Sequence, residues 1–136
     1  MKEIIAVVRM NKTNATKKAL VDVGAAGFTA EKVMGRGKLV EKKETIAARR
    51  ANLIELAKAE DDKEAEALID GFLDGTRLFP RRMFTIYAHD EDVQRIVDAI
   101  IQVNQTENNV GDGKIFVLPT MDVVRVRTGE SGEYAI

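Results

Sequence analysis

The stretch Glu3-Ile4-Ile5-Ala6-Val7-Val8-Arg9 decides the fold of this chain. Its five consecutive apolar residues, four of them β-branched, predict a strand that is buried on both faces. Such a strand lies in the middle of a sheet. The apolar run is also much shorter than the core of a signal peptide or a membrane span, so we expect a cytoplasmic protein without a membrane partner.

Two helices and four further strands are predicted outward from this strand. Residues 13–23 carry apolar side chains at helical spacing and stop at Gly24, and residues 90–105 begin with acidic residues and repeat the helical pattern. Strand patterns occupy residues 28–34, 82–88, 115–118 and 123–128. The order βαββαβ with a C-terminal hairpin is typical of an α+β, ferredoxin-like sandwich with both helices on one face of the sheet. We expect the other face to pack against further copies of the chain.

A charged insertion, from about residue 37 to residue 79, separates the second strand from the third. It contains two helical patterns, the second of which begins with the capping pair Asp61 and Glu64 and carries an apolar stripe. The stripe packs either on its own subunit or on a target protein, and the length of the insertion favours a target. We treat residues 1–136 as one domain, because the chain is too short for two ordinary ones.

Composition excludes several kinds of protein. The chain has 136 residues and a mass of 15.1 kDa, with 21 Lys and Arg against 22 Asp and Glu. A near-zero net charge provides no general attraction for nucleic acid, so an anion can bind only at a local cluster of cations. The absence of cysteine excludes disulfides, thiolate metal sites and thiol nucleophiles.

Three short segments carry clustered cations, two of them next to glycines. They are Gly111-Asp112-Gly113-Lys114, Gly35-Arg36-Gly37-Lys38 and Arg125-Val126-Arg127. Glycines let backbone N–H groups converge on a phosphate, and a strand at residues 123–128 would place both arginines on one face. Each segment alone is more often a plain turn or a solvated surface. Together, in a chain of near-zero net charge, they indicate a polyphosphate pocket.

These segments carry a resemblance to the PII (GlnB-type) family of nitrogen regulatory proteins. It covers residues 1–38 and 78–136, and its most specific parts are Gly111-Asp112-Gly113-Lys114-Ile115-Phe116-Val117 and Arg125-Val126-Arg127-Thr128-Gly129-Glu130. The resemblance implies a trimer of ferredoxin-like subunits, ATP or ADP in each cleft between subunits, and a target-binding T-loop, here the insertion. It implies no catalytic group.

The resemblance also assigns site residues. The implied ATP-binding residues are Thr29, Gly35, Gly37, Lys38, Gly111, Asp112, Gly113, Lys114, Arg125 and Arg127. The implied 2-oxoglutarate site, next to ATP and Mg²⁺, consists of Arg9, Arg81 and Lys38. Leu39 stands where the family has a glutamine that helps to hold Mg²⁺ and 2-oxoglutarate, and Arg81 replaces a lysine. An arginine still offers a carboxylate a fork of donors.

The long T-loop is similar to that of the second of the paired NifI-type proteins encoded with nitrogenase in methanogenic archaea. That resemblance implies a homotrimer or a mixed oligomer with a sister PII-like chain, direct inhibition of dinitrogenase, and release by 2-oxoglutarate. The insertion contains no tyrosine or serine, since Tyr87, Tyr134 and Ser131 lie outside it. Uridylylation or seryl phosphorylation of the loop is therefore excluded.

Three other interpretations are weaker. A PII-type regulator could act on another target, such as an ammonium transporter or glutamine synthetase. A phosphate-transferring enzyme would need a nucleophile such as His89, the only histidine, but its place at a strand end beside Asp90 favours a surface or capping role. An RNA-binding module would need aromatic residues on the central strands, and of those strands only the one that contains Phe116 has such a ring in its motif.

Overall fold

The computed structural model describes residues 1–37, 51, 55, 78–107 and 111–136. The chain divides into two compact units, one formed by Met1–Val33 with Pro80–Ile136 and the other by Met34–Phe79. Apart from Ala51 and Glu55, which are helical, the two helices expected in the insertion lie outside the described residues, as do Lys38 and Leu39. Treatment of the whole chain as one domain stays a prediction.

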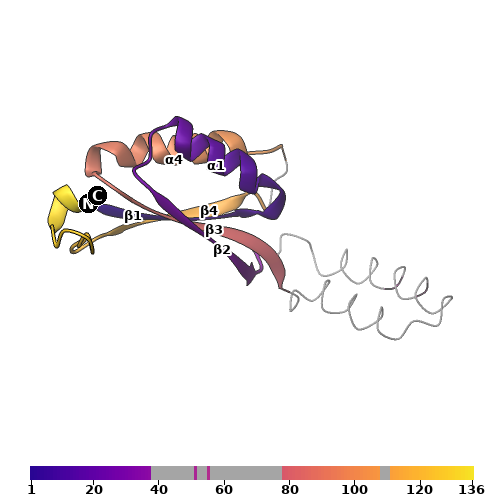
Figure 1. Cartoon of the computed structure of the whole chain (residues 1–136). Coiled ribbons are helices and arrows are strands. Elements are labelled where there is room, and N and C mark those ends of the chain that lie inside the picture. Colours follow the sequence, from indigo (N-terminus) through magenta and orange to yellow (C-terminus); the bar gives the residue numbers. More distant parts are fainter. Residues whose placement is uncertain (38–50, 52–54, 56–77, 108–110) are drawn as a thin grey trace. The chain divides into compact units, whose positions relative to one another are not determined.

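The described elements follow the expected order around one four-stranded sheet. They are β1 (Lys2–Arg9), α1 (Thr13–Asp22), β2 (Phe28–Gly35), β3 (Phe79–Ala88), α4 (Val93–Asn104) and β4 (Gly113–Pro119). The strand order is β2-β3-β1-β4, and β1 is antiparallel to both of its neighbours. Helices α1 and α4 lie side by side over one face of the sheet (Figure 1). The predicted ferredoxin-like α+β sandwich is confirmed.

The core lies between this sheet and the two helices. Its buried apolar residues are Ile4, Ala6, Val8, Leu20, Phe84, Ile86, Ala88, Ile96 and Ile100. Ile5 and Val7 point to the opposite face of β1 and are only half-buried. The prediction that β1 is buried on both faces is therefore wrong for a single chain, because the helices cover only one face of the sheet.

The expected strand at residues 123–128 is also wrong. Val124 forms an isolated bridge with Ser131, and residues 126–128 form a turn. The backbone N–H groups of Thr128 and Gly129 donate to the carbonyl of Arg125, at 3.3 and 2.8 Å. Gly129 has a φ of +71°, which lets the chain reverse direction here. Arg125 and Arg127 therefore do not share a strand face.

Proline has different effects at the ends of two strands. β3 begins at Phe79, earlier than predicted, and includes Pro80. This position is tolerated because the register with β1 begins only at Arg81, so no hydrogen bond of that ladder requires a proline N–H. Pro119 ends β4 as the sequence predicts.

Candidate functional site

The glycine loop, Gly111–Lys114, leads into β4, and its backbone depends on the two glycines. Gly111 and Gly113 have φ angles of +87° and +125°, which side-chain-bearing residues rarely adopt. A Cβ atom added to Gly113 would lie 2.3 Å from the carbonyl oxygen of Val7. The loop backbone therefore approaches β1 more closely than any other residue type would allow, and it places Lys114 directly opposite Val7.

The Asp112 carboxylate stabilises this loop by hydrogen bonds to Thr106. Its Oδ1 accepts a hydrogen bond from the Thr106 hydroxyl at 2.6 Å, and its Oδ2 accepts one from the Thr106 N–H at 2.8 Å. The Thr106 hydroxyl, then the Thr106 N–H, and then the charges of Arg9 and Lys12 hold the pKa of Asp112 below its ordinary value of 3.8. The carboxylate thus stays ionised and links the two ends of the loop.

Arg9 supports the same loop. Its Nε donates to the carbonyl of Gly111 at 2.9 Å, and its Nη2 lies 3.3 Å from Oδ1 of Asp112. Arg9 is half-buried. The side chain that the resemblance assigns to 2-oxoglutarate therefore already orients the glycine loop.

The strand register gathers three of the expected cationic residues. Arg9 lies directly opposite Arg81 on β3, and Lys114 lies opposite Val7, two residues before Arg9. Because strand side chains alternate between faces, Arg9, Arg81 and Lys114 lie on the face that the helices leave uncovered. Like charges directly opposite each other on two strands repel, and the carboxylate of Asp112, 3.3 Å from Arg9, reduces that repulsion.

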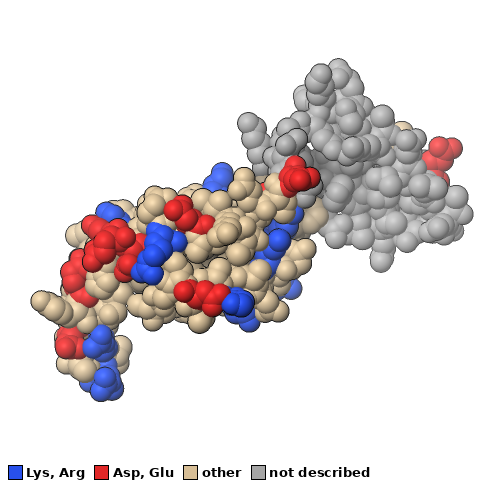
Figure 2. Space-filling view, turned by 90° about the horizontal axis from the view of Figure 1, so that it is seen from above, with Lys and Arg blue, Asp and Glu red and all other residues tan. Residues whose placement is uncertain are grey.

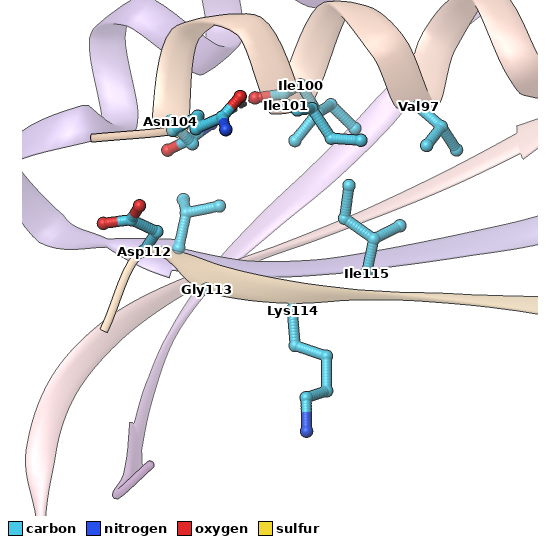
Figure 3. A pocket seen from close by; sticks show the side chains of 10 residues that line it. Val97, Ile100, Ile101, Asn104, Asp112, Gly113, Lys114 and Ile115 are labelled. Carbon is cyan, nitrogen blue, oxygen red and sulfur yellow. Dashed lines mark hydrogen bonds between the residues drawn. The ribbon is translucent and has the colours of Figure 1, made fainter. Parts of the chain in front are cut away.

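A cavity of 390 Å³ lies on the other side of β4, under α4 (Figure 3). Its walls are mostly apolar side chains, and Gln105 is also part of the lining; Asn104 and Asp112 lie at one end (Figure 3). The Lys114 side chain points away from it, to the far side of the sheet (Figure 3). The Lys114 ammonium group therefore lies on a different surface from this cavity, whereas Arg9 contacts Asp112, which lines the cavity.

Thr29 lies at a second cavity, of 280 Å³. This cavity is lined by Ala26, Gly27, Phe28, Thr29, Thr85, Tyr87, Val123, Ala135 and Ile136. The exposed Thr29 therefore lies next to β3 and the C-terminal segment, residues 120–136, rather than next to the glycine loop.

Arg125 and Arg127 belong to that C-terminal segment. The Arg125 Nη1 lies 2.6 Å from Oε2 of Glu130, and its Nη2 donates to the carbonyl of Tyr134 at 2.9 Å. Within the described part of the chain Arg127 has no hydrogen bond or ion pair, which leaves its guanidinium available to an anion. Arg125 would have to share its guanidinium between Glu130 and a ligand.

One chain holds its expected phosphate-binding residues at opposite ends of the sheet. Arg9, Arg81 and Gly113 mark one end. The C-terminal segment starts at the other end, where Thr120 donates to the carbonyl of Met1, and both termini lie there (Figure 1). The eight residues of β1 separate the two ends by roughly 25 Å. Within the described residues of one chain, Gly111–Lys114 and Arg125–Arg127 therefore do not meet in one pocket.

The remaining expected residues are only partly described. Gly35 ends β2, and Gly37 follows it in the second compact unit, with open space around the position of a Cβ atom at each. Lys38 lies outside the described residues. That this loop joins Gly111–Lys114 stays a prediction.

The described residues contain no group of three or more His, Cys, Asp or Glu side chains that could hold a metal ion. Asp112, the acidic residue of the glycine loop, already has Thr106 and Arg9 as partners. A Mg²⁺ ion here would therefore take most of its ligands from the oxygens of a bound phosphate and from water.

The charged surface is mixed. On the face formed by α1 and α4, acidic and basic side chains lie interspersed (Figure 2). In the described residues no helix has the length and apolar character needed to cross a membrane.

Comparison with known proteins identifies the family. Residues 1–130 match the family model described as nitrogen regulatory protein P-II. The chain belongs to the P-II family. Proteins of this family are signal transducers that bind nucleotides and 2-oxoglutarate, so the chain is a regulatory protein and not an enzyme.

Similar curated proteins come from methanogenic archaea. The chain is 42% identical to the nitrogen fixation nifHD region GlnB-like protein 2 of Methanobacterium ivanovii, across all of this chain and 99% of the relative. It is 39% identical to the nifHD1 region GlnB-like protein 2 of Methanosarcina barkeri, with the same coverage. It is 35% identical to the nitrogen regulatory protein P-II 2 of Methanothermobacter thermautotrophicus, across all of this chain and 97% of the relative.

Sequence reasoning missed two residues of the site's scaffold. Thr106 gives Asp112 two hydrogen bonds, and Glu133 binds the imidazole of His89 at 2.6 Å. A threonine six residues before an aspartate has no distinctive pattern. The second pair joins residues that are 44 positions apart, which no local pattern can reveal.

Proposed function

We propose that this P-II protein binds ATP or ADP in clefts between copies of the chain, senses 2-oxoglutarate next to the nucleotide, and regulates nitrogenase by reversible protein binding. One observation carries the proposal: the cluster of Arg9, Arg81 and Lys114 and the pair Arg125 and Arg127 lie at opposite ends of the sheet within one chain. A site that uses both sets needs the glycine-loop end of one sheet and the C-terminal segment of another copy.

The phosphate part of this site would combine the glycine loop of one subunit with the arginines of its neighbour. Gly111 and Gly113 shape the loop backbone, and Lys114 presents its ammonium group on the uncovered sheet face. Arg125 and Arg127 of the neighbour would add guanidinium groups, which bind phosphate oxygens in pairs. Mg²⁺ bound with ATP would neutralise phosphate charge, and Thr29 would contact the base.

The effector part would use the other cations of the cluster. Arg81 lies opposite Arg9, and Arg9 already holds the loop through Gly111. A dicarboxylate such as 2-oxoglutarate next to the phosphates would relieve the repulsion between the two guanidinium groups. Lys38 would complete this group, although Leu39 removes the glutamine expected beside it.

Regulation would follow from linkage between ligand and target. When 2-oxoglutarate favours one arrangement of the insertion and dinitrogenase binds another, each ligand weakens the binding of the other by the same factor. Relatives named as nifHD region GlnB-like protein 2 support nitrogenase as the target. A sister PII-like chain would be an oligomer partner, and the cytoplasm would hold all these components.

Calorimetry of ATP binding, with and without 2-oxoglutarate, tests this function, together with the mass of the protein in solution. We expect an oligomer that binds ATP, and tighter ATP binding when 2-oxoglutarate is present. A protein that binds neither compound, or a monomer that binds ATP fully, would contradict the proposal.

A further inference from the structure

The C-terminal segment is attached to the sheet by few contacts. Residues 122–132 close on themselves, since Gly132 donates to the carbonyl of Val123 at 3.0 Å and to Oδ1 of Asp122 at 2.9 Å. Val126 is 98% exposed and Tyr134 is 84% exposed, so these two side chains add little apolar packing, whereas Val123, Ala135 and Ile136 are half-buried. Polar contacts to the rest of the chain add to the attachment of this segment.

One of these contacts is the pair formed by His89 and Glu133. His89 follows the last residue of β3, and its Nδ1 lies 2.6 Å from Oε2 of Glu133. The other carboxylate oxygen of Glu133 accepts from the Met1 amino group at 3.4 Å. Glu133 thus ties the C-terminal segment to the ends of two core strands.

Glu133 immediately precedes Tyr134, which contacts Arg125. The backbone carbonyl of Tyr134 accepts a hydrogen bond from Nη2 of Arg125 at 2.9 Å. A displacement of Glu133 would move this carbonyl and change the direction of the guanidinium group. The chain of contacts therefore runs from His89 through Glu133 and Tyr134 to Arg125.

Acidic groups surround the imidazole. The hydrogen bond with Glu133, followed by the charges of Glu133, Glu91 and Asp92, raises the pKa of His89 above its ordinary value of 6.5. The hydrogen bond with His89 lowers the pKa of Glu133 below its ordinary value of 4.5. The opposing positive charge of Met1 is itself paired with Asp90, at 2.9 Å.

We propose that His89 and Glu133 form a latch that positions Arg125, and that protonation of His89 tightens the latch and with it the binding of nucleotide. The inference rests on the proposed function, in which Arg125 contacts phosphate. His89 is a positioning residue here, because it acts on the ligand only through Glu133 and Arg125.

The sign of the pH effect follows from the two pKa shifts. Both partners are fully charged between the ordinary values of 4.5 for Glu133 and 6.5 for His89. As the pH rises through the raised pKa of His89, the imidazole loses its charge and the ion pair becomes a neutral hydrogen bond. The latch therefore weakens toward alkaline pH.

The first test measures the latch without nucleotide. His89 is the only histidine, so one imidazole signal in a proton NMR titration reports its pKa directly. We expect a midpoint above 6.5 in the wild type and a lower midpoint in Glu133→Gln. We also expect the Arg125 side-chain resonances to shift in Glu133→Gln and to stay unchanged in the matched control Glu31→Gln, which changes an exposed glutamate of β2. An unchanged midpoint in Glu133→Gln would overturn the proposal.

The second test measures ATP affinity from about pH 6 to about pH 9 in the wild type and in His89→Gln, which keeps a polar side chain but cannot gain charge. We expect the ratio of wild-type to His89→Gln affinity to fall by about two- to fivefold over this range, as for other exposed ion pairs. Glu31→Gln, which removes an exposed carboxylate on β2 that does not contribute to the raised pKa of His89, should keep the wild-type profile shape.

The outcomes separate the two proposals. Parallel pH profiles for the wild type and His89→Gln, with clear ATP binding in both, would overturn the latch and leave the proposed function in place. A wild type that binds no ATP at any pH would overturn both. In that case the NMR titration would still show whether Glu133 controls the pKa of His89.

Discussion

Arg9 and Arg81 lie directly opposite each other on β1 and β3, so two guanidinium groups share one end and one face of the sheet. Like charges in this position reduce stability unless an anion or a carboxylate compensates them. Asp112 compensates Arg9, at 3.3 Å. A bound dicarboxylate would add a second compensation, which makes this pair the centre of the proposed effector site.

Arg81→Gln should weaken 2-oxoglutarate binding by about tenfold or more, because a charge-assisted pair to a carboxylate is lost. Arg81→Lys should lose less, since the charge remains without the planar fork. Calorimetry with saturating ATP measures the effect. Lys17→Gln, at an exposed position on α1, serves as the charge-matched control. Intact effector binding in Arg81→Gln would show that this residue has been assigned wrongly.

Gly113→Ala should destabilise the protein by about 2 kcal/mol or more, because its backbone is strained for an L residue and its Cβ would lie 2.3 Å from the Val7 carbonyl oxygen. Gly27→Ala is the control, since its Cβ would meet nothing within 4 Å. Urea unfolding of both variants measures the difference in the free energy of unfolding. Equal stability of the two variants would contradict the close approach of the loop to β1.

A buried polar pair links the two helices. Asn104, which is 5% exposed, donates from Nδ2 to the Oγ1 of Thr16 at 3.0 Å, and Thr16 is fully buried. Thr16→Val should lower the free energy of unfolding by about 1 to 2 kcal/mol, because the buried amide of Asn104 loses one of its two acceptors, the other being the carbonyl of Ile100. Thr13→Val, at a part-buried threonine of the same helix, controls for the loss of a hydroxyl. A double-mutant cycle with Asn104→Ala isolates the pair, and a coupling energy of zero would contradict it.

Asp112 should make the free energy of unfolding depend on pH in the acidic range. Its pKa is lowered in the folded chain, so its contribution is present above its ordinary value of 3.8 and is lost as the pH falls through the lowered pKa. The stability of the wild type should therefore fall more steeply in acid than that of Asp112→Asn. Thermal unfolding from about pH 6 to about pH 2.5 compares the two proteins, and parallel curves would mean that the carboxylate does not hold the loop.

Local patterns predicted the fold where the contacts are regular. The apolar run of β1, the helical spacing in α1 and α4, and the glycines before β4 gave the element order and the family. The strand expected at residues 123–128 failed because alternation there coincides with a turn that the Arg125 carbonyl and Gly129 close. The complete burial expected for β1 failed because, among the described residues, the two helices cover only one of its faces.

The scaffold of the site was less accessible to sequence reasoning. The glycine loop was predicted correctly as a feature, yet the role of Asp112 inside the loop depends on Thr106 and Arg9. Asn104 and Thr16 are 88 residues apart in the chain and meet only after folding. Such pairs leave no periodic signal, because one polar residue in a helix is compatible with many positions.

The central claim is that the glycine loop of one subunit and the Arg125 and Arg127 side chains of another subunit form one nucleotide site. Subunit complementation tests it most directly, with Lys114→Ala in one chain and Arg125→Ala plus Arg127→Ala in the other. Each variant alone should bind no ATP, whereas oligomers reassembled from an equal mixture should regain about a quarter of the wild-type sites, since each site then draws its two halves at random. Mixed oligomers that regain no ATP binding, or a wild-type monomer that binds ATP unaided, would contradict the account.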